Sequence, residues 1–250
     1  MSRLVELRTA VLAHNDDLAR ALRADLAAAG AAAVNLLSSP GSGKTALLER
    51  LLTRARALEI PVAALTGDIA TENDARRLAR SGAPVRQVLT GGLCHLEADL
   101  VRDHLAGWLP ADTRLLFVEN VGNLVCPAAY DLGERVRVVL ASVTEGEDKP
   151  IKYPAAYHWA DLVILTKTDL AAACAFDESA FAAAVSSVAP GARVVRTSAT
   201  SGEGVEELLQ VLLELAGVAE APGGRGQTPS VPGRDGERAG SVPVLAPGRR

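Results

Sequence analysis

The ten residues from Leu36 to Thr45 read Leu-Leu-Ser-Ser-Pro-Gly-Ser-Gly-Lys-Thr, and they constrain the fold more than any other stretch. An apolar run at 31–34 precedes them, and leucines at helical spacing follow them. Strand, small-residue loop, Lys-Thr and helix is the context in which a phosphate-binding loop works. Small residues allow successive backbone N–H groups to curl around an anion, and the helix N-terminus adds partial positive charge.

Within this loop, we expect Lys44 to reach the β- and γ-phosphates of a nucleotide and the Thr45 hydroxyl to ligate Mg²⁺. Ser38 stands where the general pattern has Gly, so three of the four fixed positions match. A glycine-rich turn with a capping Thr is the alternative, and the flanking strand and helix favour the phosphate loop. The other residues expected to bind nucleotide here are Ser39, Gly41, Ser42 and Gly43.

Strands alternate with helices along the chain, which predicts an α/β fold with a doubly wound, mostly parallel sheet. We expect an N-terminal helical segment at 1–29, one P-loop domain at 30–217 and a disordered Pro/Gly/Arg-rich tail at 218–250. The first helix has a polar interruption at 14–16 that would permit a break. The expected strands lie near 31–34, 60–66, 84–89, 114–119, 135–141, 161–165 and 194–195, with later helices near 96–108 and 203–216.

Composition excludes several classes of protein. The formal net charge of −4 gives no reason to expect a nucleic-acid partner. There is no run of about 18 apolar residues, so we expect no membrane span. The N-terminus lacks the apolar core of a secretory signal, and three cysteines are too few for a disulfide framework. These features predict a cytoplasmic protein.

Two acidic residues at strand ends are candidate magnesium ligands. Asp68 ends the second strand and is expected to face Mg²⁺ directly or through water, with a helix N-cap as the open alternative. Glu119 ends the fourth strand, and Gly122 follows it at the spacing of the second phosphate element of P-loop GTPases, where Gly122 would sense the γ-phosphate. The candidate catalytic residues are Lys44, Thr45, Asp68, Glu119 and Gly122.

Asn123 stands where many GTPases have a catalytic Gln. Without that Gln the attacking water is poorly oriented, so we predict slow intrinsic hydrolysis.

The run Thr166-Lys167-Thr168-Asp169 is similar to the base-reading element of GTPases. A carboxylate at Asp169 can accept hydrogen bonds from both N1 and N2 of guanine, whereas adenine would leave this acceptor unpaired. The Lys167 stem can cover the base, and Ser198-Ala199 is placed to contact the guanine oxygen. The nucleotide is therefore predicted to be GTP.

Cys94, His95 and Cys126 form a second candidate site. Thiolate and imidazole suit Ni²⁺ or Zn²⁺, and three ligands leave a tetrahedral site open for a transient ion. From the spacing alone, two buried thiols and a capping His remain an open alternative. Cys174 lies in an Ala-rich stretch that predicts helical core packing.

Four motifs together resemble the GTPases that insert nickel into hydrogenase, the HypB family. The motifs are Ser38–Thr45, Gly67-Asp68, Thr90-Gly91 with Cys94–Ala98, and Glu119–Pro127, and the resemblance covers roughly 5–215. It implies a SIMIBI-type P-loop fold and a metallochaperone that binds GTP with Mg²⁺ and dimerises in the nucleotide-bound state. It further implies nickel loading of [NiFe]-hydrogenase, with a nickel-delivery accessory protein and the hydrogenase large subunit as partners.

The resemblance also implies residue roles. Cys94, His95 and Cys126 become the expected ligands of Ni²⁺ or Zn²⁺ at a subunit interface, and Lys149 is a candidate contact to nucleotide across the dimer. Three departures stand out: Leu93 occupies a position where glycine is common, Thr166 replaces Asn, and the N-terminal cysteine motif and His-rich stretch of some members are absent.

Three other functions are consistent with parts of the sequence. The urease-accessory GTPases share the core but have a Cys-Pro-His metal motif, which this chain lacks. A non-hydrolysing metal-binding or storage protein is disfavoured by a total of four histidines. A P-loop kinase that uses ATP is disfavoured by Asp169 with Lys167.

Overall fold

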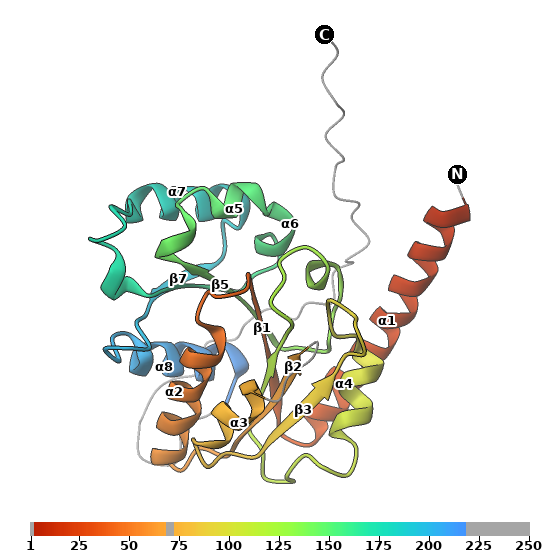
Figure 1. The fold of residues 1–250 in the computed structure, drawn as a ribbon. Helices are drawn as coiled ribbons and strands as arrows, with labels where there is room; N and C mark the ends of the chain where they lie inside the picture. Colours follow the sequence, from red (N-terminus) through yellow and green to blue (C-terminus); the bar gives the residue numbers. More distant parts are fainter. Residues whose placement is uncertain (1–2, 69–72, 219–250) are drawn as a thin grey trace. The chain divides into compact units, whose positions relative to one another are not determined.

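A parallel sheet of seven strands forms the centre of the fold, in the order β3-β2-β4-β1-β5-β6-β7 (Figure 1). The computed structural model describes residues 3–68 and 73–218, and the side chains from residue 9 onward within them. Each neighbouring pair of strands is parallel, as expected for strands joined by helical crossovers. The strands are β1 (Ala32–Ser38), β2 (Val62–Asp68), β3 (Val85–Leu89), β4 (Leu115–Glu119), β5 (Val136–Ser142), β6 (Leu162–Thr166) and β7 (Arg193–Arg196).

Helices cover both faces of the sheet (Figure 1). The α-helices are α1 (Arg3–Ala28), α2 (Lys44–Ala57), α3 (Asn73–Ala79), α4 (Ala98–Leu105), α5 (Lys149–Lys152), α6 (Pro154–Tyr157), α7 (Glu178–Val188) and α8 (Val205–Ala216). Three short 3₁₀ helices complete the described elements: η1 (Pro127–Ala129), η2 (Val143–Glu145) and η3 (Thr168–Leu170). Among the residues described, no helix combines the length and apolar character needed to cross a membrane.

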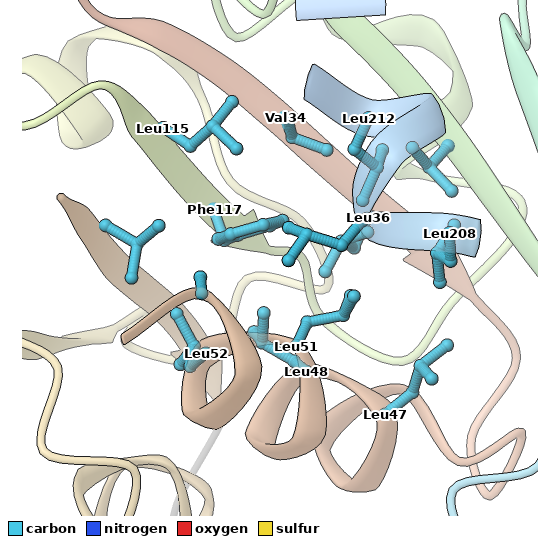
Figure 2. Packing of buried hydrophobic residues seen from close by; sticks show 14 of the residues in the cluster. Val34, Leu36, Leu47, Leu48, Leu51, Leu52, Leu115, Phe117, Leu208 and Leu212 are labelled. Atoms are coloured by element: carbon cyan, nitrogen blue, oxygen red, sulfur yellow. The ribbon is translucent and has the colours of Figure 1, made fainter. Parts of the chain in front are cut away.

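The core is divided by the sheet into packed layers. On one face, α2, α3 and α8 pack against alternate residues of the strands; Figure 2 shows Leu48 and Leu51 of α2 facing Leu36 and Phe117. On the other face, α1 and α4 cover the β2–β4 half, while α6 and α7 cover the β5–β6 half. Burial of both faces explains why the strands are nearly continuous apolar runs rather than alternating patterns.

The predicted fold class is confirmed, with every described strand pair parallel. The predicted strand positions agree with the structure to within about two residues, except that β1 continues to Ser38, four residues beyond the predicted end at 34. The proposed tail and the boundary at 218 remain predictions, because 219–250 lie outside the described residues. Thr71, which by residue type could serve as a helix N-cap, also lies outside them.

Three predictions about local structure were wrong. Helix α1 continues without a break through 14–16, because the polar Asn15 is buried and hydrogen-bonded. The helix predicted at 96–108 covers only α4, because Leu96 belongs to the preceding loop and Gly107 adopts a left-handed φ of 66°. Cys174 is exposed in a turn rather than packed in the core, since alanines alone supply little apolar area to bury.

Candidate nucleotide and metal site

Lys44, Thr45 and Glu119 meet where β1 and β4 end. Glu119 Oε1 accepts a 2.6 Å hydrogen bond from Thr45 Oγ1 and lies 3.3 Å from Lys44 Nζ. Glu119 Oε2 accepts a 3.2 Å bond from Thr66 Oγ1 on β2, and the Glu119 side chain is only 1% exposed. A buried carboxylate beside a hydroxyl is a donor set that suits Mg²⁺. Thr45 and Glu119 therefore fit the roles that the sequence predicts for them.

The loop before α2 has the backbone shape that an anion site requires. Gly41 and Gly43 adopt φ values of 75° and 93°. These values favour glycine because glycine has no Cβ to clash with the backbone. No side chain caps the N-terminus of α2, so its first N–H groups point toward the loop without a side-chain acceptor. Ser42 is buried and its Oγ has no partner among the described residues.

Gly122 lies directly against the phosphate loop. A Cβ built on Gly122 would lie 3.3 Å from Pro40 Cα, closer than most real contacts allow. The next residue, Asn123, forms an isolated antiparallel bridge with Ser38. The segment after β4 therefore touches the loop that would hold the phosphates. Asp68, half-buried at the end of β2, lies at the same edge of the sheet.

The predicted base-reading residues are tied to the same loop. Thr166 Oγ1 donates a 2.6 Å hydrogen bond to the Ser42 carbonyl, and Lys167 Nζ donates a 2.7 Å bond to the Gly41 carbonyl. Lys167 adopts a left-handed φ of 58°, and Asp169 is exposed in η3. Thr166, which stands where the base-reading element usually has Asn, thus links this element to the phosphate loop.

The second pair predicted to contact guanine, Ser198 and Ala199, lies in the loop between β7 and α8. Ser198 is buried, and its Oγ accepts a hydrogen bond from Ser201 N. The Ala199 carbonyl accepts a 2.9 Å bond from Arg50 Nε, which fixes this loop against α2.

Lys149 is not brought into this cluster. Its Nζ lies 2.9 Å from Glu145 Oε1 and 4.9 Å from the centroid of the Tyr153 ring. Its predicted contact to nucleotide across a dimer is not represented in a single chain.

Cys94, His95 and Cys126 do come together. A hydrogen bond between the two sulfurs is the main reason that the pKa of the Cys94 thiol is raised, and desolvation adds to it. The Cys94 Sγ is 3.7 Å from His95 Nδ1, while His95 Nε2 is 3.1 Å from Glu97 Oε1. If Nε2 carries the proton toward Glu97, Nδ1 is free to bind a metal on the side of the sulfur.

The ring of His95 is further held by Tyr130, which stacks on it with centroids 4.1 Å apart. Within the described residues, the geometry does not assemble three or more His, Cys, Asp or Glu side chains into a group ready to hold one metal ion. The two thiols and the imidazole are adjacent, but they do not enclose a common point in one chain.

The sequence analysis did not predict a role for Asn120, and it singled out Asn123 only because it stands where many GTPases have Gln. Asn120 Oδ1 accepts hydrogen bonds from Val121 N and, at 3.3 Å, from Leu96 N. Asn123 Nδ2 donates a 3.4 Å bond to the Cys94 carbonyl. The sequence signal was present, since both asparagines flank the predicted sensor Gly122, but their partners lie more than twenty positions away.

The loop that carries Cys94 and His95 also explains why residue 67, near the end of β2, is a glycine. A Cβ on Gly67 would lie 2.9 Å from a methyl carbon of Leu96, which is fully buried. The glycine therefore allows the segment that carries Cys94 and His95 to pack against the sheet.

Comparison with known proteins identifies the family of the chain. The model of the CobW/HypB/UreG nucleotide-binding domain matches residues 32–196. The hydrogenase maturation factor HypB of Azotobacter vinelandii is 48% identical over 211 residues, which cover 83% of this chain and 68% of the relative.

Two solved structures place the fold. A crystal structure of HypB from Helicobacter pylori in complex with nickel is 35% identical, with a TM-score of 0.75, and the match covers 80% of this chain and 94% of that one. The signal recognition particle 54 kDa protein of Aeropyrum pernix, in complex with GDP, is 18% identical with a TM-score of 0.54 over 75% and 46% of the two chains, a likeness of fold alone. The chain belongs to the CobW/HypB/UreG family of P-loop proteins, and within it to the HypB hydrogenase maturation factors.

Proposed function

We propose that this protein is a slowly hydrolysing GTPase that binds nickel as cargo and delivers it, in the cytoplasm, to an [NiFe]-hydrogenase large subunit. A nickel-delivery accessory protein is the proposed donor or assistant. The observation that carries the proposal is a pair of contacts. The segment that contains Cys94 is hydrogen-bonded to the segment after β4. The segment after β4 in turn touches the phosphate loop. The nickel complex of the H. pylori relative supports the choice of metal.

The attachment offers a route for coupling nucleotide and metal. Glu119 would hold Mg²⁺ with Thr45, and Gly122 would approach the γ-phosphate. Asn120 and Asn123, on either side of Gly122, bind the backbone of the segment that contains Cys94 and Leu96. A shift of Gly122 by the γ-phosphate therefore changes the position of the Cys94 sulfur relative to Cys126.

Slow hydrolysis is supported by the contacts of Asn123. Its Nδ2 donates to the Cys94 carbonyl, and its Oδ1 accepts a 2.8 Å hydrogen bond from Val125 N. A side chain engaged at both ends is poorly placed to orient an attacking water. We expect kcat well below 1 s⁻¹ for the protein alone, of the order expected for a GTPase without its activator.

Dimerisation is supported by exposed apolar side chains beside the metal ligands. Leu93 and Val125, each next to one of the cysteines, are 46% and 66% exposed. Covering them with a second copy would bury this apolar surface and supply further ligands to an ion that one chain does not enclose. The proposed dimer forms with GTP and Mg²⁺ bound.

The proposal is tested by titrating Ni²⁺ into protein loaded with GDP or with a non-hydrolysable GTP analogue. We expect the nickel affinity to differ between the two nucleotides, and Cys94→Ala to abolish tight binding in both. Cys174→Ala is the matched control, because Cys174 is exposed and outside the site. Unchanged nickel binding in Cys94→Ala would contradict the assignment of the ligands.

The coupling route is tested separately with Asn123→Ala. This variant should still bind nickel and nucleotide, but the difference in nickel affinity between GDP and the analogue should shrink.

Equal affinities for GTP and ATP in the wild type would contradict guanine selectivity and favour a kinase-like protein.

A further inference from the structure

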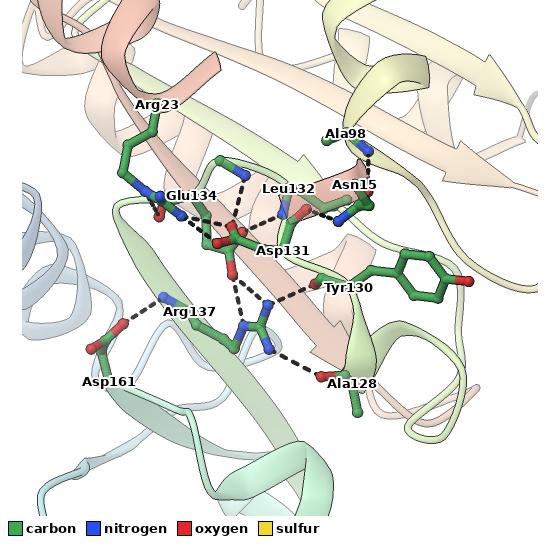
Figure 3. A network of polar contacts seen from close by, with 11 residues as sticks. Asn15, Arg23, Ala98, Ala128, Tyr130, Asp131, Leu132, Glu134, Arg137 and Asp161 are labelled. Atoms are coloured by element: carbon green, nitrogen blue, oxygen red, sulfur yellow. Dashed lines mark hydrogen bonds and ion pairs between the residues drawn. The ribbon is translucent and has the colours of Figure 1, made fainter. Parts of the chain in front are cut away.

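Asn15, in the middle of helix α1, connects the first residue of α4 to the loop that follows η1 (Figure 3). It is only 4% exposed. Its Nδ2 donates a 2.8 Å hydrogen bond to the Asp131 carbonyl, and its Oδ1 accepts a 2.9 Å bond from Ala98 N. These partners lie 116 and 83 positions away in the chain, so a single amide joins three distant segments.

The bond to Ala98 fixes the loop that carries Cys94 and His95. Ala98 is the first residue of α4, and the N-cap residue Glu97 makes no side-chain capping bond to the helix. The Asn15 oxygen therefore does the work of an N-cap from another helix. Glu97 is left to pair with His95 Nε2, at 3.1 Å.

The bond to Asp131 fixes the loop that carries Cys126. The same helix adds Arg23, whose Nη2 lies 2.7 Å from both carboxylate oxygens of Asp131. Tyr130, the residue before Asp131, stacks on the ring of His95. Helix α1 thus holds the segment after Cys126 and the segment after His95 against one another.

We propose that α1 sets the geometry of the metal site and that Asn15 is its positioning residue. Asn15 acts on Cys94, His95 and Cys126 by fixing the separation of their loops, without contacting a divalent ion itself. The inference rests on the proposed nickel site. It assigns a role in metal binding to a helix that also packs on the sheet through Leu22 and Leu26.

Cover alone does not account for this residue. The apolar contacts of α1 with the sheet are made by Leu22 and Leu26, about two and three turns further along the helix. A buried amide is costly unless its hydrogen bonds are satisfied, and an apolar residue would serve a purely covering helix. The Asn15 oxygen accepts a hydrogen bond from Ala98 N, and its nitrogen donates one to the Asp131 carbonyl. Both polar groups of the amide are therefore satisfied by the segments that follow His95 and Cys126.

The test uses the full-length protein and Ni²⁺ alone as the probe, with affinity from calorimetry and geometry from the nickel–thiolate charge-transfer absorption. Asn15→Ala should weaken nickel binding by about tenfold or more, as removal of groups that orient metal ligands typically does. It should also shift the absorption band, while GTP affinity stays within about twofold because both hydrogen bonds of the Asn15 amide go to segments outside the phosphate loop.

Two further variants make the test specific. Asn15→Asp keeps an acceptor for Ala98 N and loses the donor to Asp131, so we expect intermediate nickel affinity; it carries the test if Asn15→Ala does not fold. Arg20→Ala, on the same helix and paired with Asp17, should leave affinity and spectrum unchanged.

The outcomes separate this inference from the proposed function. Wild-type affinity and an unshifted band in folded Asn15→Ala, or in Asn15→Asp if that variant carries the test, would overturn the role of Asn15 alone. Absence of nickel binding in the wild type, or its persistence in Cys94→Ala, would overturn the proposed metal site and this inference with it.

Discussion

At the scale of the residue, Tyr157 in α6 shows what a buried polar group costs. Its side chain is fully buried, and its hydroxyl has no hydrogen-bond partner in the part of the chain described here. Burial, with the nearby Glu145, raises the pKa of this phenol, so the group is neutral over the physiological range. The ring fills the core while the oxygen loses its hydration.

We predict that Tyr157→Phe stabilises the protein by about 1 kcal/mol, because it removes a buried hydroxyl without changing the ring. Urea denaturation of both proteins measures the difference in unfolding free energy. Tyr153→Phe is the control, since Tyr153 is only partly buried. A decrease in stability for Tyr157→Phe would show that the hydroxyl makes a favourable contact.

The residues that could be predicted from the sequence share one property. Lys44, Thr45 and Glu119 occur in short motifs whose chemistry dictates residue type, and the order of strands brings the motifs to one edge of the sheet. Asn15 and Tyr130 belong to no motif, because their roles come from packing between distant segments. The polar interruption at 14–16 was a visible signal, but from one helix alone a buried amide and a helix break look alike.

At the scale of the element, β5 anchors the loop that carries Cys126. Arg137 on β5 is 1% exposed and its guanidinium lies 2.6 Å from Glu134 Oε1. It also donates hydrogen bonds to the carbonyls of Ala128 and Tyr130, at 3.2 and 2.7 Å (Figure 3). The shape of the loop after Cys126 is therefore imposed by the sheet.

Arg137→Met is predicted to destabilise the protein by about 3–5 kcal/mol, because it removes the guanidinium that compensates the charge of the buried Glu134. The double variant Arg137→Met/Glu134→Gln should recover part of the loss, since it removes the uncompensated charge. Chemical denaturation gives these differences, with Arg135→Ala at a neighbouring exposed position as the control. Near-neutral behaviour of Arg137→Met would mean that Glu134 finds another partner or is protonated.

Elements were predictable where hydrophobic periodicity was strong and less so at their ends. Helix α2 and the strands are apolar patterns of clear period, and their existence follows from the sequence. The helix predicted near 96–108 begins too early because Leu96 fits the helical spacing. In the structure Leu96 lies in the loop before α4, and its side chain packs over Gly67. Periodicity records which residues are buried, but not whether a helix or a loop buries them.

At the scale of the whole molecule, the alternation of strands and helices predicts a parallel sheet, but the strand order does not follow from it. The central position of β1, between β4 and β5, places the phosphate loop in the middle of the carboxyl edge. The residues that would bind phosphate, magnesium, base and metal all extend from this edge, so one binding event can affect the others.

We predict that Mg²⁺ with GTP raises the unfolding free energy of the protein by about 2.7 kcal/mol when the ligand is at 100 times its Kd. ATP at the same concentration should give a smaller shift, because a carboxylate at Asp169 does not pair with adenine. Thermal denaturation with and without ligand measures both shifts. Lys44→Ala should lose most of the shift, and equal shifts for the two nucleotides would refute guanine selectivity.

The shared position of Glu119 has a consequence for how the nucleotide must arrive. Lys44 and Thr45 are both engaged with this one carboxylate, which is almost fully enclosed. A triphosphate that draws Lys44 away without bringing a cation would leave the Glu119 carboxylate uncompensated beside the negative phosphates. A divalent cation that enters with the phosphates would replace the positive charge that Glu119 loses, so we expect the pocket to favour the magnesium-chelated nucleotide over the free anion.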